Sequence, residues 1–306
     1  MAPRIVVVGS VNMDLVATAP VLPRPGQTVM GRDFASVPGG KGGNQAIAAA
    51  RAGGASALVA AIGSDSFGVT LQSRLSGSAV DTSRLRVVYG TSGVALVMVD
   101  DFGEIEIVVA PGANAQLTGL TDDELAAVRA ADVLLCQLEV PVETVTAAVV
   151  AARSAGTRVL VNAAPARPLP AELLDATDLL VVNRAEARAV VDTAGGDDEE
   201  LAGELLRLVP RVVLTMSSAG SWYAERGTDP VRVPTAVVEP VDRTAVGDAF
   251  CGALAVAWGE GRSLPEAVRW ASAAGACCAR RPGSSISLPH RAEIDELHRQ
   301  TYAGAT

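Results

Sequence analysis

The sequence predicts an α/β protein with a doubly wound, mostly parallel central sheet, helices on both faces and a small β-sheet lid. Six short apolar runs rich in β-branched residues each end in polar residues or Gly, and Ala/Leu-rich segments lie between them. Such runs are typical of buried parallel strands, and their alternation with helices predicts a doubly wound sheet. The expected strands are 5–10, 57–63, 132–139, 158–165, 178–186 and 211–220, and the expected helices include 44–53, 121–130, 142–155, 184–192 and 198–208.

Two segments depart from this alternation and predict the lid. Residues 14–37 hold Pro-rich turns and strand-like pieces without a helix. Residues 93–109 hold two β-rich runs around Asp101-Phe102-Gly103, which is a hairpin pattern. Both insertions are expected to form a small sheet over the mouth of the main one. Residues 1–306 are therefore expected to be a single α/β domain with this lid.

Composition and charge argue against several classes of function. The chain has 306 residues, 49% hydrophobic and 19% charged, which fits a globular protein with a sizeable core. A net charge of -9 without a long basic run argues against a nucleic-acid partner. Charges, Gly or Pro interrupt every apolar run, so no membrane span is expected. The apolar run at the start of the sequence is too short for a secretory signal. The expected location is the cytoplasm.

Histidine and cysteine limit the possible chemistry. His290 and His298 both lie near the C-terminus, so a His-dependent triad is not expected and a carboxylate is the expected base. The cysteines have small or apolar neighbours and no metal-ligand spacing, and they are expected to be reduced, partly buried thiols. These cysteines are Cys136, Cys251, Cys277 and Cys278.

The glycine-rich stretch PGGKGGNQAIAAARAGG (38–54) is the first motif that suggests a binding site. Four glycines surround Lys41, and Asn44 opens an Ala-rich helix. The glycine spacing fits neither a Walker A loop nor a dinucleotide fingerprint. Backbone N–H groups, Lys41 and Asn44 suit the hydroxyls of a polyol. A flexible loop with Asn44 as helix N-cap is the structural alternative.

The stretch GSVNMDLV (9–16) is the second motif. Asn12 and Asp14 stand at alternate positions after the first strand, so both can face one side. An acid and an amide that face the same side can bind vicinal hydroxyls of a ligand. An Asx-turn is the structural alternative.

The stretch VDRTAVGDAF (241–250) is the third motif, and it places Asp248 at a helix start. The N–H groups of Ala245, Val246 and Gly247 can hold a transferring phosphoryl group while Asp248 takes a proton from an attacking hydroxyl. A helix N-cap is the alternative role for Asp248.

Ordered similarities along the chain point to one family. Beside GGKGGNQA (39–46) and GDAFCGAL (247–254) stand NMD (12–14), PGAN (111–114), QLE (137–139), NAAPAR (162–167) and LPEAVRWA (264–271). In these pieces the chain resembles the ribokinase (PfkB) family of carbohydrate kinases over essentially its full length. The resemblance implies a ribokinase-like fold and ATP-dependent phosphorylation of a small sugar, with the 5-hydroxyl of D-ribose as the first expectation.

The resemblance also implies roles for individual residues. Asp248 would be the base, and the amides of Ala245, Val246 and Gly247 would form the anion hole. The implied sugar site comprises Asn12, Asp14, Gly40, Lys41, Gly42, Gly43, Asn44, Glu139 and Asp248. The implied ATP site comprises Asn183, Thr215, Met216, Ser217, Ser218, Ala219, Gly220, Gly247, Asp248 and Ser272.

Cations and a dimer follow from the same resemblance. It implies Mg²⁺ near Asn183 and Glu186, held mainly through water, and a homodimer formed through the lid. It implies a monovalent cation, K⁺, beside the anion hole, with ligands at Asp242, Thr244, Cys278, Arg281, Gly283 and Ser287, several of them backbone carbonyls.

Three positions depart from the family pattern. Arg243 replaces the usual Thr, Val246 a small residue, and Ser217 a common Gly. Val246 keeps its N–H donor, but its side chain must point away from a bound phosphate. Arg243 can contact a phosphate or shield the cation loop, and Ser217 can alter the backbone angles of the ATP loop or simply be tolerated.

Two other functions stay open. One is a kinase of the same family for deoxyribose, fructose or a nucleoside. Aromatic residues make up only 3% of the chain, and Phe34 and Phe102 are the only lid candidates for stacking on a nucleobase. The other is a sugar-binding protein whose catalysis has decayed, which Arg243 and Val246 suggest and the intact Asp248 opposes.

Overall fold

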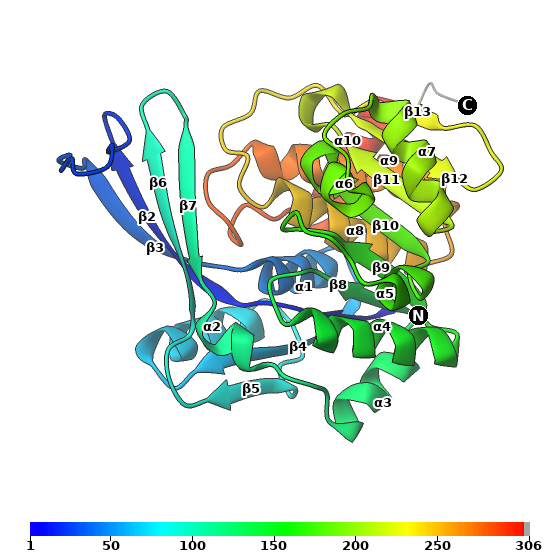
Figure 1. Ribbon diagram of the computed structural model, residues 1–306, viewed down its shortest axis with the longest axis horizontal. Coiled ribbons are helices and arrows are strands. Elements are labelled where there is room, and N and C mark those ends of the chain that lie inside the picture. Colours follow the sequence, from blue (N-terminus) through cyan, green and yellow to red (C-terminus); the bar gives the residue numbers. More distant parts are fainter. Residues whose placement is uncertain (303–306) are drawn as a thin grey trace.

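The computed structural model describes residues 1–302, which form two separate sheets (Figure 1). The strands of the large sheet are β1 (Arg4–Val8), β4 (Ala55–Gly63), β5 (Leu85–Val88), β8 (Val133–Cys136), β9 (Arg158–Asn162), β10 (Leu179–Asn183), β11 (Arg211–Thr215), β12 (Ser221–Glu225) and β13 (Val231–Val233). Their order is β13-β12-β11-β10-β9-β8-β1-β4-β5. Strands from β11 to β5 are parallel, whereas β12 and β13 are antiparallel to their neighbours. The expected fold class is confirmed.

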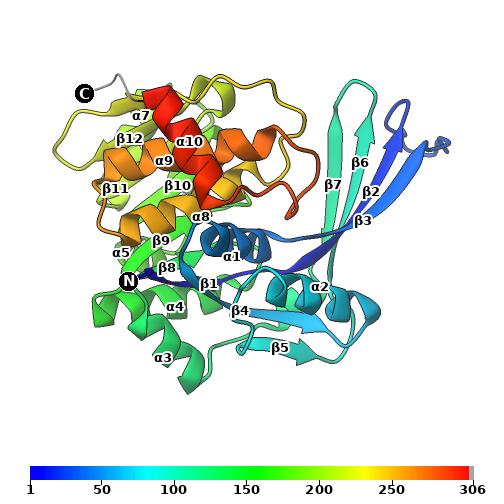
Figure 2. The same ribbon diagram turned by 180° about the vertical axis from the view of Figure 1, so that it is seen from behind.

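Helices cover both faces of the large sheet (Figures 1 and 2). In β1 the buried side chains alternate: Ile5 and Val7 pack into one apolar core, and Val6 and Val8 into the other. The first core includes α1 (Lys41–Arg51), α2 (Ser66–Ser76), α8 (Val246–Gly259), α9 (Leu264–Ala279) and α10 (Arg291–Tyr302). The second includes α3 (Asp122–Ala130), α4 (Val142–Ala155), α5 (Ala171–Asp175), α6 (Arg184–Val191) and α7 (Asp198–Leu208).

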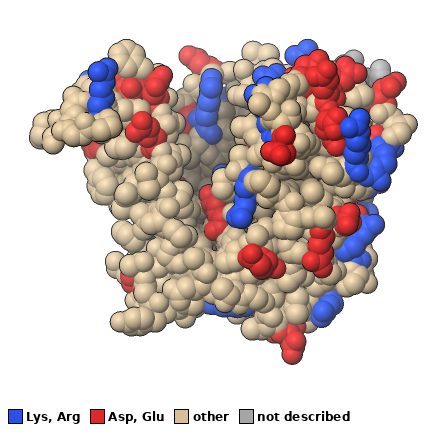
Figure 3. Space-filling view, viewed as in Figure 1, with Lys and Arg blue, Asp and Glu red and all other residues tan. Residues whose placement is uncertain are grey.

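The small sheet is built from the two insertions that the sequence singled out. Its strands are β2 (Asn12–Ala19), β3 (Asp33–Gly39), β6 (Gly93–Asp100) and β7 (Ile105–Ala110), in the order β3-β2-β6-β7. β6 and β7 form the predicted antiparallel hairpin, while β2 pairs in parallel with β6. This sheet stands beside the main body, and Figure 3 shows the cleft between them.

Three strands of the small sheet leave the main body at one point. Asn12, the first residue of β2, pairs with Gly39 at the end of β3 and with Gly93 at the start of β6. Directly after β3 the chain enters α1. The first two sequence motifs therefore lie together at the junction of the two sheets.

Two helix starts differ from the structural alternatives considered for the motifs. α1 begins at Lys41 with Gly40 as N-cap, so the structural alternative in which Asn44 caps the helix is wrong. Gly40 has φ 86°, and a Cβ atom there would lie 2.5 Å from the Asn12 nitrogen, which only glycine avoids. α8 begins at Val246, so Asp248 lies within the first turn and is not the N-cap either. Neither Asn44 nor Asp248 therefore serves as a helix N-cap.

Candidate active site

The polar ends of the parallel strands and the start of α8 meet at one edge of the large sheet. Ser10 follows β1, Glu139 follows β8, and Asn162 ends β9. Parallel strands bring their carboxyl ends to the same edge, which is where open α/β sheets bind ligands. The hydrogen bonds described below join these residues to α1 and α8, so all three sequence motifs share one site.

Asp248 is the centre of this site. Its carboxylate is 8% exposed, and both of its oxygens accept hydrogen bonds from helix α1. Asn44 Nδ2 donates to Oδ2 at 3.0 Å, and Gln45 Nε2 donates to Oδ1 at 2.9 Å. Asn44 Nδ2 also lies 3.0 Å from Ser284 Oγ. The side chain expected to be the base is therefore held in one orientation from two sides.

Several buried polar residues of this network were missed at the level of sequence. Gln45 Nε2 also donates to Asn162 Oδ1 at 3.1 Å, and Gln137 Nε2 donates to Gln45 Oε1 at 2.5 Å. All three lie within sequence pieces that carry the family resemblance, which was the available signal. Asn114 was missed as well. Its Nδ2 donates to Asn12 Oδ1 at 2.7 Å, so the side-chain oxygen of Asn12 already accepts a hydrogen bond and the amide is held in one orientation.

Glu139 and the glycine-rich loop are bound to each other. Ser10 Oγ donates to Glu139 Oε2 at 2.5 Å, and the Lys41 backbone N–H donates to the same oxygen at 3.2 Å. Gly42 packs directly on this turn, since a Cβ atom there would lie 2.6 Å from the Ser10 nitrogen. The predicted sugar residues of the two segments are thus brought together, with the Lys41 side chain among the acids.

Burial and mutual repulsion shift the pKa values of these acids. Burial, with the charges of Glu139 and Asp248, raises the pKa of Asp14 to about 7, although Lys41 opposes the shift. Burial also raises the pKa of Asp248, and Lys41, Gln45 and Asn44 oppose it. Burial disfavours the charged amine of Lys41, but Asp248, Glu139 and Glu186 outweigh it and raise its pKa. Lys41, the only lysine of the chain, is the positive centre of an acidic site.

The turn before α8 leaves backbone donors free. Ala245 is the N-cap, with φ 58° and ψ 10°, in the left-handed region. Within residues 1–302 the amides of Ala245 and Gly247 donate to no protein acceptor. Val246 packs against the core, with its Cγ1 3.4 Å from where a Cβ atom at Gly275 of α9 would lie. Its branched side chain is thus directed towards α9, as a free anion hole would require.

The expected ATP loop forms a tight turn after β11. A short 3-10 helix, η2 (Ser217–Ala219), follows Met216, and the Gly220 N–H donates to the Ser217 carbonyl at 3.1 Å. Ser217 has φ 54° and is exposed. It therefore takes the left-handed conformation that glycine adopts easily, and the fold tolerates it. Ser272 is buried within α9.

Asn183 and Glu186 form a reciprocal capping box at the start of α6. The Glu186 N–H donates to Asn183 Oδ1 at 2.9 Å, and the Asn183 N–H donates to Glu186 Oε2 at 2.8 Å. Burial raises the pKa of Glu186, and the bond from Asn183 and the charge of Lys41 oppose the shift. The pair has a clear structural role, and Glu186 Oε1 has no part in the cap.

The residues expected around a monovalent cation lie on the loop before α8, at the end of α9 and on the loop that follows α9. Asp242 Oδ1 accepts from the Thr244 N–H at 2.8 Å, and Asp242 Oδ2 accepts from the Gly283 N–H at 2.8 Å. Cys278 Sγ lies 3.1 Å from Ser287 Oγ and 3.6 Å from the Thr244 carbonyl oxygen. The Arg281 side chain instead turns outward to pair with Glu293. No cluster of three or more His, Cys, Asp or Glu side chains suited to a metal occurs in residues 1–302.

The four cysteines are free thiols, and all four are buried. The sequence predicted only partial burial. The helices give no membrane span either. In residues 1–302 none combines the length and the apolar character that a bilayer crossing needs.

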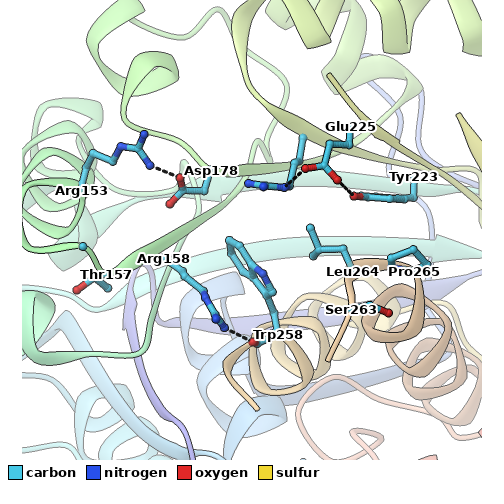
Figure 4. Close-up of a pocket in the computed structure, with 12 residues that line it drawn as sticks. Arg153, Thr157, Arg158, Asp178, Tyr223, Glu225, Trp258, Ser263, Leu264 and Pro265 are labelled. Atoms are coloured by element: carbon cyan, nitrogen blue, oxygen red, sulfur yellow. Dashed lines mark hydrogen bonds and ion pairs between the residues drawn. The ribbon is translucent and has the colours of Figure 1, made fainter. Parts of the chain in front are cut away.

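A cavity of about 700 Å³ lies away from this site (Figure 4). It is at the opposite edge of the sheet, because Arg158 and Arg211 are the first residues of β9 and β11. Arg211 Nε lies 2.9 Å from a Glu225 oxygen, and Arg158 donates to the Trp258 carbonyl. These side chains already bind neighbouring elements, and none of the residues assigned to the sugar, ATP or cation sites lines the cavity.

Comparisons with known proteins agree with the geometry of the site. The model of the pfkB family carbohydrate kinases matches residues 2–291. A ribokinase of Bacillus subtilis is 36% identical, covering 96% of this chain and 99% of its own, and a mouse ribokinase is 31% identical, covering 96% and 94%. The structure of Arabidopsis thaliana ribokinase complexed with ribose and ATP has a TM-score of 0.91 and 31% identity, covering 98% of this chain and 99% of its own.

The chain therefore belongs to the pfkB family of carbohydrate kinases. Members of this family transfer a phosphoryl group to an alcohol, so the chain is classed as a phosphotransferase.

Proposed function

We propose that this protein is a ribokinase, which transfers the γ-phosphoryl group of ATP to the 5-hydroxyl of D-ribose. The observation that carries the proposal is the buried Asp248 carboxylate in the first turn of α8, held by Asn44 and Gln45 and close to the charges of Lys41 and Glu139. The similarity to ribokinases along nearly the whole chain supports ribose and ATP as the substrates.

In this proposal the sugar lies between the two sheets. Asp14, Glu139 and the side-chain oxygen of Asn44 accept hydrogen bonds from its hydroxyls, and Asn12 and Lys41 donate to them. Gly40, Gly42 and Gly43 let the backbone approach the sugar closely. Five polar groups around a small neutral ligand match the rule that buried hydroxyls need partners.

Asp248 takes the proton of the attacking hydroxyl. Its buried carboxylate has a raised pKa, which brings a proton acceptor closer to the working pH. The free amides of Ala245 and Gly247, with that of Val246, stabilise the charge of the transferring phosphoryl group. Neither departure in this motif obstructs the step, because Val246 packs towards α9 and Arg243 is exposed.

ATP would occupy the turn after β11. The proposed contacts are the backbone of Thr215, Met216, Ser217, Ser218, Ala219 and Gly220, with Asn183 and Ser272 close by. The free oxygen of Glu186 and its burial near Lys41 fit a carboxylate that holds Mg²⁺ through water. Mg²⁺ would neutralise charge on the ATP phosphates.

A monovalent cation would fit the two loops beside the anion hole. Oxygen ligands suit K⁺, and the backbone carbonyls of Thr244, Cys278 and Arg281 provide them whatever the side chain. Asp242, Gly283 and Ser287 complete the proposed set. The cation would hold the loop before Ala245 in place. The expected cytoplasmic location stays a prediction.

We also propose a homodimer formed by the small sheet. Leu96 and Val108 are paired across β6 and β7, and with Phe34 they lie on the face opposite Asp14. All three are about half exposed or more, which is unusual for three apolar side chains on one sheet face. A second copy of this sheet would cover them.

The proposed function is tested by measuring ATP-dependent phosphorylation of ribose, deoxyribose, fructose and a nucleoside, each with and without K⁺. We expect the highest kcat/KM for ribose and a higher rate with K⁺. A preference for a nucleoside or another sugar would replace ribose as the substrate. Ribose binding without turnover of any sugar would instead indicate a decayed kinase.

A further inference from the structure

Asp248 is held by a chain of buried amides from three different elements. Gln137, just after β8, donates to the side-chain oxygen of Gln45 on α1, and Gln45 donates to both Asp248 and Asn162. Gln45 and Gln137 are fully buried. Burying side-chain amides that have no ligand-binding role costs free energy. This series of hydrogen-bonded amides therefore needs a functional explanation.

The direction of these hydrogen bonds limits the state of Asp248. Because Gln137 donates to Gln45 Oε1, Gln45 must present its NH₂ group to Asp248. An NH₂ group only donates, so Asp248 Oδ1 must accept, and Asn44 Nδ2 makes the same demand on Oδ2. Donors at both oxygens favour the ionised carboxylate over the carboxylic acid.

We propose that Gln45 is a positioning residue that keeps Asp248 ionised and oriented as the proton acceptor, and that Gln137 fixes the direction of the Gln45 amide. This inference rests on the proposed function, in which Asp248 is the base. Gln45 touches neither sugar nor phosphate in this arrangement and acts through Asp248 alone.

Charged groups from other elements act on the same carboxylate. Lys41 favours its ionised form, and Glu139 opposes it. The titratable groups whose charges interact with Asp248 are Asp14 on β2, Lys41 on α1, Glu139 after β8, Cys251 on α8 and Cys278 on α9. Replacing Gln45 leaves all of these unchanged, so a change in the titration of Asp248 reports the lost amide.

The test compares Gln45→Leu with the wild type in kcat and KM between pH 5 and 9. Loss of one hydrogen bond to a charged group is expected to move the acid limb of the profile up by about one pH unit. It should lower kcat by about tenfold on the acid limb of the profile while KM for ribose changes little. The exposed Gln72→Leu on α2 is the matched control and should leave the profile unchanged.

Gln137→Leu is the second variant, and it does not touch Asp248. Gln137 Oε1 has no hydrogen-bond partner within residues 1–302, so leucine removes one unpaired buried acceptor and leaves another, Gln45 Oε1, without its donor. Without Gln137 the direction of the Gln45 amide is no longer fixed. The acid limb of the pH profile should therefore move in the same direction as in Gln45→Leu, by a smaller amount. If Gln45→Leu does not fold, this variant decides alone.

A carboxyl ¹³C NMR titration makes the test independent of turnover, with Asp248→Asn identifying the Asp248 signal. We expect Asp248 to titrate at higher pH in Gln45→Leu than in the wild type. An unchanged titration and an unchanged acid limb in folded variants would overturn the inference. Absence of sugar phosphorylation by the wild type would overturn the proposed function instead, and the NMR result would still stand.

Discussion

At the scale of single residues, the site depends on a few groups held in uncommon states. Ser217 and Ala245 have positive φ, and Asp14 is an acid whose pKa is near neutrality. Left-handed backbone at a residue other than glycine costs roughly 1–2 kcal/mol. Such costs are typical of functional sites, where the surrounding structure holds a residue in place.

Ser217 tests whether the proposed ATP loop needs its left-handed turn. Ser217→Gly should keep or slightly raise the free energy of unfolding, because glycine reaches φ 54° without strain. Ser217→Val should lower it by about 1–2 kcal/mol, since a β-branched side chain resists this conformation. Urea unfolding measures both, with the neighbouring exposed Ser218→Val as control. Equal stability of the two valine variants would contradict the assigned turn.

Asp14 predicts how stability depends on pH. Its pKa is about 7 in the folded protein and 3.8 as the ordinary value, so the folded state binds the extra proton between these pH values. The stability that this proton provides is present below pH 4 and is lost as pH rises through 7. The Tm advantage of Asp14→Asn over the wild type should therefore grow between pH 5 and pH 8.

The control for Asp14 is Glu106→Gln, an exposed acid on β7 of the same sheet. Its Tm difference from the wild type should not grow between pH 5 and 8. A growing difference for Glu106→Gln, or a constant one for Asp14→Asn, would show that Asp14 does not carry the buried charge.

At the scale of elements, the small sheet has two tasks. Its base brings Asn12 and Asp14 to the junction, and its outer part exposes apolar side chains on β6 and β7. A sheet with such an exposed face needs a cover or charges to stay soluble.

The proposed dimer is tested at this face. Leu96→Glu and Val108→Glu place charges into the interface and should convert the dimer to a monomer in analytical ultracentrifugation. Val87→Glu, at an equally exposed apolar residue of β5, is the matched control and should remain dimeric. A monomeric wild type, or dimers of both lid variants, would contradict the interface.

Much of the element map followed from the sequence. The six predicted strands and five predicted helices all occur, since buried runs such as that of β1 and amphipathic Ala/Leu segments have strong local signals. β12 and β13 were not predicted as strands, because SWYAE of β12 is not a continuous apolar run and β13, at the sheet edge, has only three residues. The start of α1 was misplaced because a glycine N-cap, unlike Asn, gives no side-chain signal.

The site was predicted in part, for a similar reason. Asp248, Asn44 and Glu139 stand in motifs with a recognisable chemistry, and the structure brings them together. Gln45 and Gln137 make their decisive bonds to each other and to Asp248 across 92 and 203 positions of the chain. Hydrogen bonds over such separations follow from the packing of the sheet and helices, which no local pattern describes.

At the scale of the whole molecule, the site exists because two sheets and one helix start converge. Asp248 comes from α8, its partners from α1, and Asp14 from the small sheet. Asp14, Glu139 and Asp248 are acids whose charges interact in this site, and Lys41 beside them is the only lysine of the chain. The central statement is that Asp248 accepts the proton of a sugar hydroxyl during phosphoryl transfer.

That statement is tested by the rate of ribose phosphorylation in Asp248→Asn, in a protein whose Tm and ribose affinity are measured alongside. We expect kcat to fall by about 100- to 10,000-fold, the usual contribution of a general base, while the fold and ribose binding persist. A folded Asp248→Asn that phosphorylates ribose at the wild-type rate would contradict the central statement.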